Sequence, residues 1–436
     1  MTTPIDLMSK DRAGLEKLAT DPEADQLCQA AEELLPGLIE SGRLGEALEW
    51  VESVLAAGPS GERLAWALAH QAHLQRRAGI PSPGAEASLL RALELSAENT
   101  HLFVLSELGK LYLHQGDLRQ AAIYLRECVD SAERLFGESH REVAAVLHGL
   151  AGVLRAQGNL AGARETLERT LAIWKEVLGT EAHLDVAVTL HQFAGVLEAQ
   201  GDLSGAREKL ERSLAIKAEV LETEAHPEVA ASLHALAGVL QAEGDLSRAR
   251  EKLERCLAIK AEIFGTEAHP DVAASLHDLA EVLQAEGDLS GARENLERTL
   301  AIWAQVFGTE IHPHVATGLR TLAGVLQEQG DLPGAREKLE RSLAIQAEVY
   351  GTREHYLTAV TEVDLVPLLL DQGEVQRGME LLTHAYGVFQ RQLGPDHPRT
   401  QEVAEVFAYL EARSGRGRQL SGTEEMKPVD FPAAPA

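Results

Sequence analysis

Four histidines at a constant spacing are the residues of this sequence best suited to do chemistry. They follow one another at intervals of 43 residues, and other residue types occupy the aligned positions on both sides. An imidazole can bind a metal ion or hydrogen-bond a ligand, and it titrates near pH 6.5. We call this column of positions the ladder. It consists of Ser106, His148, His191, His234, His277, Arg320 and Val363.

Two further columns accompany the ladder on the same predicted helices. Glycine inside a helix costs about 1 kcal/mol relative to alanine, so repeated glycines indicate close approach of a ligand or of a neighbouring helix. The glycine column, four residues after the ladder, reads Lys110, Gly152, Gly195, Gly238, Glu281 and Gly324. The third column reads Leu113, Arg155, Glu198, Gln241, Gln284 and Gln327.

The elements that position these columns are repeated pairs of helices. Turn glycines recur at 42 and then 43 residues, from Gly116 to Gly373, and Gly42 and Gly79 mark two looser units upstream. In the copy at 267–302, apolar residues at helical spacing precede Gly287, a left-handed helix cap, and Asp288, an N-cap. The two stripes are Leu276, Leu279, Ala280 and Leu283, then Leu289, Ala292, Leu296, Thr299 and Leu300.

This unit resembles the tetratricopeptide repeat (TPR). Its pattern is filled in order by Leu276, Leu279, Ala280, Leu283, Gly287, Leu289, Ala292, Leu296 and Thr299. The long repeat, with a Gly-x-x-x-His-Pro linker, is similar to the kinesin-light-chain class, and the resemblance covers about residues 25–413. It implies an all-α, right-handed α-solenoid of about nine helix-turn-helix units, in which each first helix lines a concave groove.

The expected organisation has five parts. They are a mobile lead at 1–20, two irregular units at 21–97, seven long units at 98–394, a capping helix at 395–413 and a disordered tail at 414–436. Pro36 and Pro367 lie inside first helices, which marks terminal units as atypical caps or introduces kinks. Glu222 replaces a linker glycine, so this joint is expected to have a different shape.

Composition excludes several classes of function. The net charge of −28 opposes binding to nucleic acid and to anionic membranes. Three widely spaced cysteines form neither a disulfide framework nor a zinc motif.

The sequence shows no signal peptide and no apolar stretch of membrane-spanning length, so we expect a cytoplasmic protein. We find no catalytic motif, and we predict no enzyme activity, cofactor or metal site.

The resemblance makes the three columns the candidate partner-binding surface. Three interpretations of the ladder histidines remain open: products of repeat duplication, a ligand-binding surface, or a metal site. Neighbouring repeats stack about 10 Å apart, so four histidines could not converge on one ion. The predicted groove residues are Lys110, His148, Arg155, His191, Glu198, His234, Gln241, His277, Glu281, Gln284, Arg320 and Gln327.

Two tryptophans and a second histidine series complete the candidates. Trp174 and Trp303 share a column with Lys217, Lys260 and Gln346, so we expect them to be exposed, either as binding hot spots or with each ring lying along its own helix. The second series lies beside the linkers, where a structural role is expected; it consists of His140, His183, His226, His269, His312, His355 and His397. Cys128 and Cys256 occupy a small-residue column and should be buried.

These patterns predict a scaffold or adaptor that binds a partner peptide, helix or domain in the groove. The alternative is a regulatory or sensor subunit that controls a separately encoded effector enzyme, in a bacterial signalling or defence system. The oligomeric state and the identity of the partner do not follow from the sequence.

Overall fold

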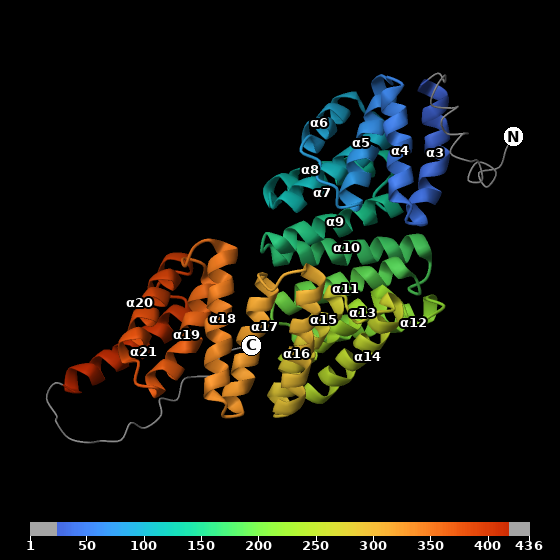
Figure 1. Cartoon of the computed structure of the whole chain (residues 1–436). Helices are drawn as coiled ribbons and strands as arrows, with labels where there is room; N and C mark the ends of the chain where they lie inside the picture. Colours follow the sequence, from blue (N-terminus) through green and yellow to red (C-terminus); the bar gives the residue numbers. More distant parts are fainter. Residues whose placement is uncertain (1–23, 418–436) are drawn as a thin grey trace. The chain divides into compact units, whose positions relative to one another are not determined.

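The computed structural model describes residues 24–417, and these residues form helices joined by short turns (Figure 1). Nine pairs of helices precede a last single helix, as the repeat pattern predicts. The helices are α3 (Ala24–Glu40), α4 (Leu44–Ala56), α5 (Gly61–Arg77), α6 (Ala85–Leu95), α7 (Glu98–Gln115), α8 (Leu118–Phe136), α9 (Arg141–Ala156), α10 (Leu160–Leu178), α11 (Leu184–Ala199), α12 (Leu203–Val220), α13 (Pro227–Ala242), α14 (Leu246–Phe264), α15 (Pro270–Glu286), α16 (Leu289–Phe307), α17 (Pro313–Glu328), α18 (Leu332–Tyr350), α19 (Tyr356–Asp371), α20 (Val375–Gln392) and α21 (Pro398–Gly417).

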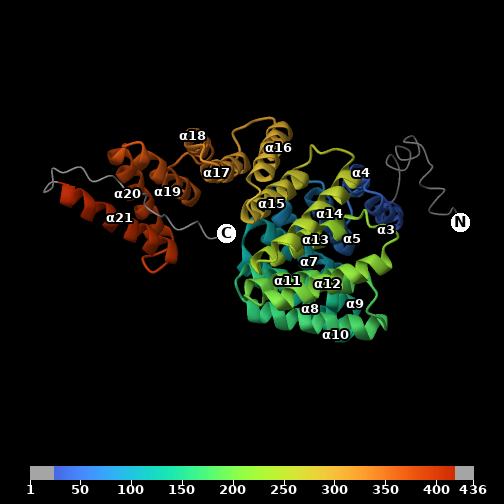
Figure 2. The same ribbon diagram turned by 90° about the horizontal axis from the view of Figure 1, so that it is seen from below.

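The chain divides into two compact units, Met1–Val220 and Leu221–Ala436. In each unit a helix packs against the partner in its own repeat and against the next repeat, as α11 does with α12 (Figure 2). The division falls in the linker that carries Glu222. Among the described non-glycine residues only Glu98 has a positive φ, so Glu222 does not form the left-handed cap made by Gly265 and Gly308. This confirms that the Glu222 joint has a different conformation.

In the central turns of the long repeats a glycine follows one helix and an aspartate precedes the next, except that Asn159 and Glu374 replace the aspartate in two of them. Gly287 adopts φ 84°, a conformation that glycine reaches without a steric penalty. The Asp288 carboxylate then accepts a hydrogen bond of 3.0 Å from the backbone N–H of Gly291. Both predicted roles are confirmed.

The linker histidines are helix N-caps. The Nδ1 of His226 and of His269 accepts the backbone N–H two residues further on, at 3.1 Å in both cases. His397 makes the same bond at 3.2 Å, and the His269 ring also stacks on Phe264 at a centroid distance of 3.5 Å. The predicted structural role of this series is confirmed.

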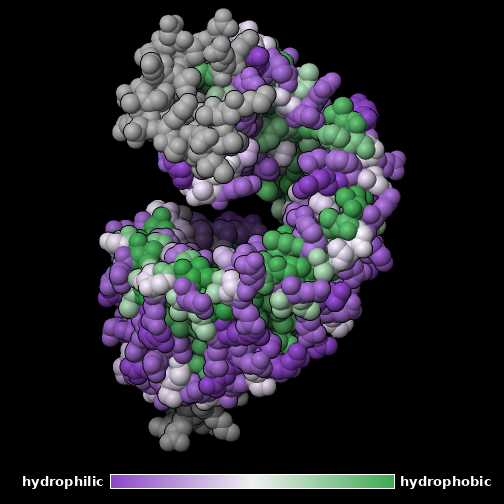
Figure 3. Space-filling view, turned by 90° about the vertical axis from the view of Figure 1, so that its right-hand side faces the viewer, coloured by the Kyte–Doolittle hydropathy of each residue, from purple (hydrophilic) through white to green (hydrophobic). Residues whose placement is uncertain are grey.

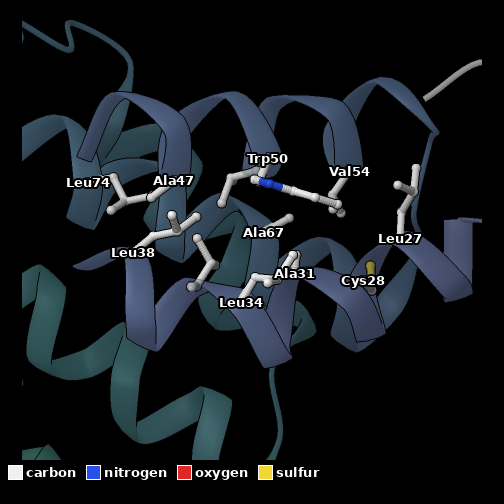
Figure 4. Packing of buried hydrophobic residues seen from close by; sticks show 12 residues of the cluster. Leu27, Cys28, Ala31, Leu34, Leu38, Ala47, Trp50, Val54, Ala67 and Leu74 are labelled. Carbon is white, nitrogen blue, oxygen red and sulfur yellow. The ribbon is translucent and has the colours of Figure 1, made fainter. Parts of the chain in front are cut away.

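The core is built from small and aliphatic side chains. In the first two repeats, Leu34, Trp50 and Leu74 meet between α3, α4 and α5 (Figure 4). In later repeats the small-residue column of the second helix bonds back to the first: Cys256 Sγ lies 3.3 Å from the carbonyl of Ala230. Cys128 and Cys256 are fully buried, as predicted. Hydrophilic residues cover most of the face shown in Figure 3.

The predicted ends of the fold are partly described. The helices α3 and α19 run on through Pro36 and Pro367. The helix α21 reaches Gly417, four residues beyond the predicted capping helix. The predicted lead at 1–20 and the tail from 418 onward lie outside the described residues. No described helix combines the length and the apolar character needed to cross a membrane.

Candidate functional site

The ladder side chains of the second unit reach the first helix of the following repeat. His234, on α13, places Nε2 at 2.8 Å from the Asp278 carboxylate and Nδ1 at 3.0 Å from Ser275 Oγ, both on α15. One repeat later His277 Nε2 lies 3.1 Å from Thr321 Oγ1. These histidines therefore join neighbouring repeats.

Arg320 continues the same contact at the next joint. Its guanidinium Nη1 lies 3.3 Å from Asp364 Oδ2 on α19, again 44 residues further along the chain. Burial raises the pKa of Asp364, and the charge of Arg320 opposes that rise. Along the second unit the ladder thus presents an imidazole to Asp278, an imidazole to Thr321 and a guanidinium to Asp364.

The His234–Asp278 contact is an ion pair at neutral pH. The hydrogen bond between His234 and Asp278 is the main reason why the pKa of His234 is raised to about 9. Burial by itself raises the pKa of Asp278, but the hydrogen bond from His234 and the nearby His277 outweigh it and lower the pKa to about 2.

In the first unit the ladder histidines are half-buried. The backbone carbonyl of His148 accepts a hydrogen bond of 3.1 Å from Gln192 Nε2 on the next first helix. His191 is half-buried as well. The joint between α9 and α11 is therefore also crossed by a polar contact near the ladder.

The glycine column makes room for side chains of neighbouring repeats at several joints. A Cβ added to Gly195 would lie 2.8 Å from the Arg155 guanidinium, and one added to Gly152 would lie 3.0 Å from Gln192 Nε2. At Gly238, by contrast, an added Cβ would meet nothing within 4 Å. At these joints the glycines therefore leave space for the ends of neighbouring side chains.

The third column is the most accessible of the three. Arg155 and Glu198 are exposed, and Gln241 and Gln327 are half-buried. The amide Nε2 of Gln284 donates to Glu328 Oε1 at 2.6 Å, which is another contact between successive repeats.

Lys110 belongs to a charge cluster around a buried glutamate. Glu107 on α7 is 1% exposed and accepts Lys110 Nζ at 2.8 Å, Arg76 Nη2 at 3.0 Å and His73 Nδ1 at 3.1 Å. Burial by itself raises the pKa of Glu107, but the hydrogen bond from His73 and the charge of Lys110 lower it to about 2.

The predicted exposure of Trp174 and Trp303 is wrong. Each is only 5% exposed, and Trp303 lies in the core cluster with Leu276 and Val315. The prediction assumed that a column which accepts lysine must reach water. Instead Lys217 is 0% exposed and Gln346 is 2% exposed.

The contacts of Lys260 explain why this column is internal. Lys260 Nζ donates to the carbonyl of Asp271 and to Ser275 Oγ, both at 2.8 Å, on the first helix of the next repeat. A buried polar side chain is tolerated when it is hydrogen-bonded in this way. The tryptophans fill the same space with an apolar ring, so they stabilise a joint and do not form a surface hot spot.

A cavity of about 600 Å³ lies among α7, α8 and α9. Its lining includes the apolar side chains of Leu102, Phe103 and Phe136, together with Ser106 and Lys110 from the columns. This volume lies in the range of small-molecule pockets, which are mainly apolar with a few polar groups.

The cavity exists because this joint carries small residues where other joints carry large ones. Ala132, which lines it, aligns with Trp174, Lys260 and Trp303 of later repeats. Gly149 has the same place relative to Ser106 that Asp278 has relative to His234. A Cβ added to Gly149 would meet nothing within 4 Å. This joint therefore lacks a large side chain both at Ala132 and at Gly149.

One group of potential metal ligands occurs among the described residues. The side chains of His277, Asp278 and Glu281 offer ligand atoms that all lie within 4.8 Å of one another. His277 and Glu281 are predicted groove residues, and α15 brings them together one turn apart. Burial raises the pKa of Glu281.

Sequence reasoning missed the residues on the other side of each contact. Asp278, Thr321 and Asp364 stand one position after the ladder in successive repeats. A comparison of the ladder with this neighbouring column pairs His234 with Asp278 and Arg320 with Asp364. That opposite-charge pairing between repeats was a signal available in the sequence.

Comparison with known proteins gives a consistent picture of the repeats. A family model described as tetratricopeptide repeat matches five overlapping segments, 100–176, 142–219, 185–262, 228–305 and 271–348, which together span more than half of the chain. A search of curated proteins gives no match.

Several solved structures are similar to this chain. The TPR-like repeats of a kinesin light chain protein from Podosopora anserina are 34% identical, with 47% of this chain and 95% of that chain covered and a TM-score of 0.42. A STAND signal transduction ATPase with a TPR sensor, from Pyrococcus horikoshii, has 13% identity, coverage of 88% and 55%, and a TM-score of 0.63. A Rap protein complexed with competence and sporulation factor has 14% identity, coverage of 90% and 99%, and a TM-score of 0.54. For the last two the likeness extends to the fold alone.

Proposed function

Because the chain belongs to the tetratricopeptide repeat family, we propose that it is a non-enzymatic scaffold or adaptor for a partner peptide, helix or domain. The partner lies along the first helices of the repeats. The cavity among α7, α8 and α9 is the observation that carries this proposal, since it opens beside Ser106 and Lys110 of the predicted surface.

The cavity is suited to a large apolar side chain of the partner. Its walls come from three helices, and the array itself places a tryptophan or a lysine at the aligned position of other joints. A buried apolar anchor surrounded by polar contacts is the usual design of a binding hot spot. The exposed polar residues of the third column in the same unit, Arg155 and Glu198, supply contacts along the rest of the segment.

Selection from a displayed peptide library tests this function. We expect the full chain to enrich peptides that share a large apolar residue. Filling the cavity by Ala132→Trp or Gly149→Leu should weaken their binding at least about tenfold, which corresponds to 1.4 kcal/mol. The matched control is Gly45→Leu, because Gly45 is also a helical glycine with open space, and it lies on α4, outside the cavity and the three columns. Unchanged binding in both filled variants would contradict the proposal.

The alternative is a regulatory or sensor subunit that acts on a separately encoded effector enzyme. Two proteins of similar fold support its consideration: one contains a TPR sensor in a signal transduction ATPase, and the other is complexed with competence and sporulation factor. Co-purification of a catalytic protein in a fixed ratio would favour this alternative. A partner that exchanges freely would favour the adaptor.

A further inference from the structure

We propose that His277, Asp278 and Glu281 form a binding site for a divalent transition-metal ion, with Zn²⁺ as the best match. All three residues come from α15, within the second unit. The four ladder histidines lie on successive repeats, so they could not converge on one ion. The structure instead places two carboxylates beside one of them.

The distances suit a single ion. His277 Nδ1 lies 3.7 Å from Asp278 Oδ1 and 3.8 Å from Glu281 Oε1. Ligands at about 2.1 Å from a tetrahedral zinc ion stand about 3.4 Å apart. Small rotations of the two half-buried carboxylates would therefore complete the site, and three protein ligands leave a fourth position for water.

Thr321 orients the histidine for this role. The Thr321 hydroxyl lies 3.3 Å from the carbonyl of Thr317, to which it donates, and 3.1 Å from His277 Nε2. The hydroxyl oxygen thus accepts the Nε2–H of His277, which leaves the lone pair of Nδ1 directed toward the two carboxylates. Hydrogen bonds of this kind fix the tautomer of metal-binding histidines.

Asp278 is held by a partner outside the site. Its Oδ2 lies 2.8 Å from His234 Nε2, while Oδ1 faces His277. Ligating carboxylates commonly have such a second hydrogen bond. His277 is 12% exposed, and the side chains of Asp278 and Glu281 are 35% and 42% exposed, so an ion can enter from solvent.

Repeat duplication does not explain this cluster. At the position of Asp278 the other long repeats carry Glu107, Gly149, Gln192, Ala235, Thr321 and Asp364. At the position of Glu281 they carry Lys110, Gly152, Gly195, Gly238, Gly324 and Pro367. The repeat with α15 is the only one of these that combines the histidine with a carboxylate at both positions.

Donor chemistry favours a borderline transition metal over Mg²⁺ or Ca²⁺. One imidazole nitrogen and two carboxylate oxygens are typical ligands of Zn²⁺, whereas Mg²⁺ and Ca²⁺ take mostly oxygen ligands in larger shells. Affinity should therefore follow the order Zn²⁺ above Mg²⁺.

Titration calorimetry of the full chain, freed of metal by a chelator, tests the site. We expect one saturable Zn²⁺ per chain and a visible absorption band of tetrahedral Co²⁺. Asp278→Ala and Glu281→Gly each install the residue of the preceding repeat, Ala235 or Gly238. Each should weaken Zn²⁺ binding at least about 100-fold, because loss of a direct ligand costs more than loss of a ligand's hydrogen-bond partner. Circular dichroism checks that both variants keep their helices.

Asp271→Asn is the matched control. Asp271 is also a carboxylate of α15 near a histidine, since its Oδ2 lies 3.8 Å from His269 Nδ1, but it lies outside the proposed site. We expect its Zn²⁺ affinity to equal that of the unmodified chain. The proposal would be overturned if Glu281→Gly bound Zn²⁺ as tightly as the unmodified chain, or if Asp271→Asn lost as much affinity as Glu281→Gly.

Discussion

Each unit contains a buried carboxylate that is paired with basic side chains. Glu107 in the first unit and Glu362 in the second are both 1% exposed, and both are surrounded by basic groups. A buried charge is strongly unfavourable unless it is paired and hydrogen-bonded. Removal of one member of such a group destabilises the protein, because the remaining charges are left unpaired. Glu107, whose pKa is lowered to about 2, therefore links the stability of the first unit to pH.

Glu107→Gln should make the chain less stable at neutral pH and less sensitive to acid. The pKa of Glu107 is lowered from 4.5 to about 2, so its contribution is fully present above pH 4.5 and is lost as the pH falls through about 2. We expect a loss of about 1–3 kcal/mol at pH 7, which shrinks toward pH 2. Urea midpoints across this range measure it.

The exposed Glu94→Gln is the control for that comparison. It should leave the urea midpoint unchanged at every pH. If Glu107→Gln lowered the midpoint equally at pH 7 and pH 2, the assigned ionisation would be wrong.

At the scale of the elements, joints between repeats are closed by matched pairs of residues. Lys260 pairs with Ser275, and Gln346 Nε2 donates to Thr361 Oγ1 at 3.0 Å. Where Trp303 stands, the facing residue is Gly318, because a larger side chain would meet the indole. A polar or an apolar pair thus fills each of these three joints.

Gly318→Ala should destabilise the second unit. Its Cβ would lie 2.9 Å from Trp303 Cζ3 and 3.0 Å from Leu300 Cδ2, which is overpacking that costs about 1–3 kcal/mol. Gly238→Ala, where an added Cβ meets nothing within 4 Å, should stabilise by about 1 kcal/mol through helix propensity. Thermal unfolding followed by circular dichroism distinguishes the two signs, and equal shifts would refute the packing argument.

At the scale of the whole molecule, stability is distributed along the array. Within each unit helices contact their neighbours in sequence and little beyond the next repeat. Such arrays gain stability from each repeat and from each interface between neighbours. A local change therefore need not spread through the chain.

Hydrogen exchange of the Gly318→Ala variant should reveal this locality. We expect faster amide exchange in α16 and α17 and in the helices beside them, and unchanged exchange in α3 to α6. Equal acceleration in both regions would mean that the chain unfolds as one cooperative body. Gly238→Ala serves as the comparison within the same unit.

The repeat pattern alone determined the helical fold, the turns and the caps, because these depend on local residue types. Gly287, Asp288 and the linker histidines act within a few residues of their own positions, so their roles could be predicted. The ladder and the tryptophan column could be located in the same way, but their surroundings could not. Burial of Trp303 and the contacts of His234 depend on residues of the next repeat.

Tertiary packing decided what the candidate columns do. Lysine and tryptophan share one internal column, in which the half-buried Lys260 finds hydrogen-bond partners on α15, and a pattern of residue types does not reveal this. The cavity beside Ser106 requires small residues on three different helices at once. The grouping of His277 with Asp278 and Glu281 likewise depends on side-chain directions and on the support of Thr321 and His234. Spacing along the chain determined the scaffold, and contacts between repeats determined its candidate sites.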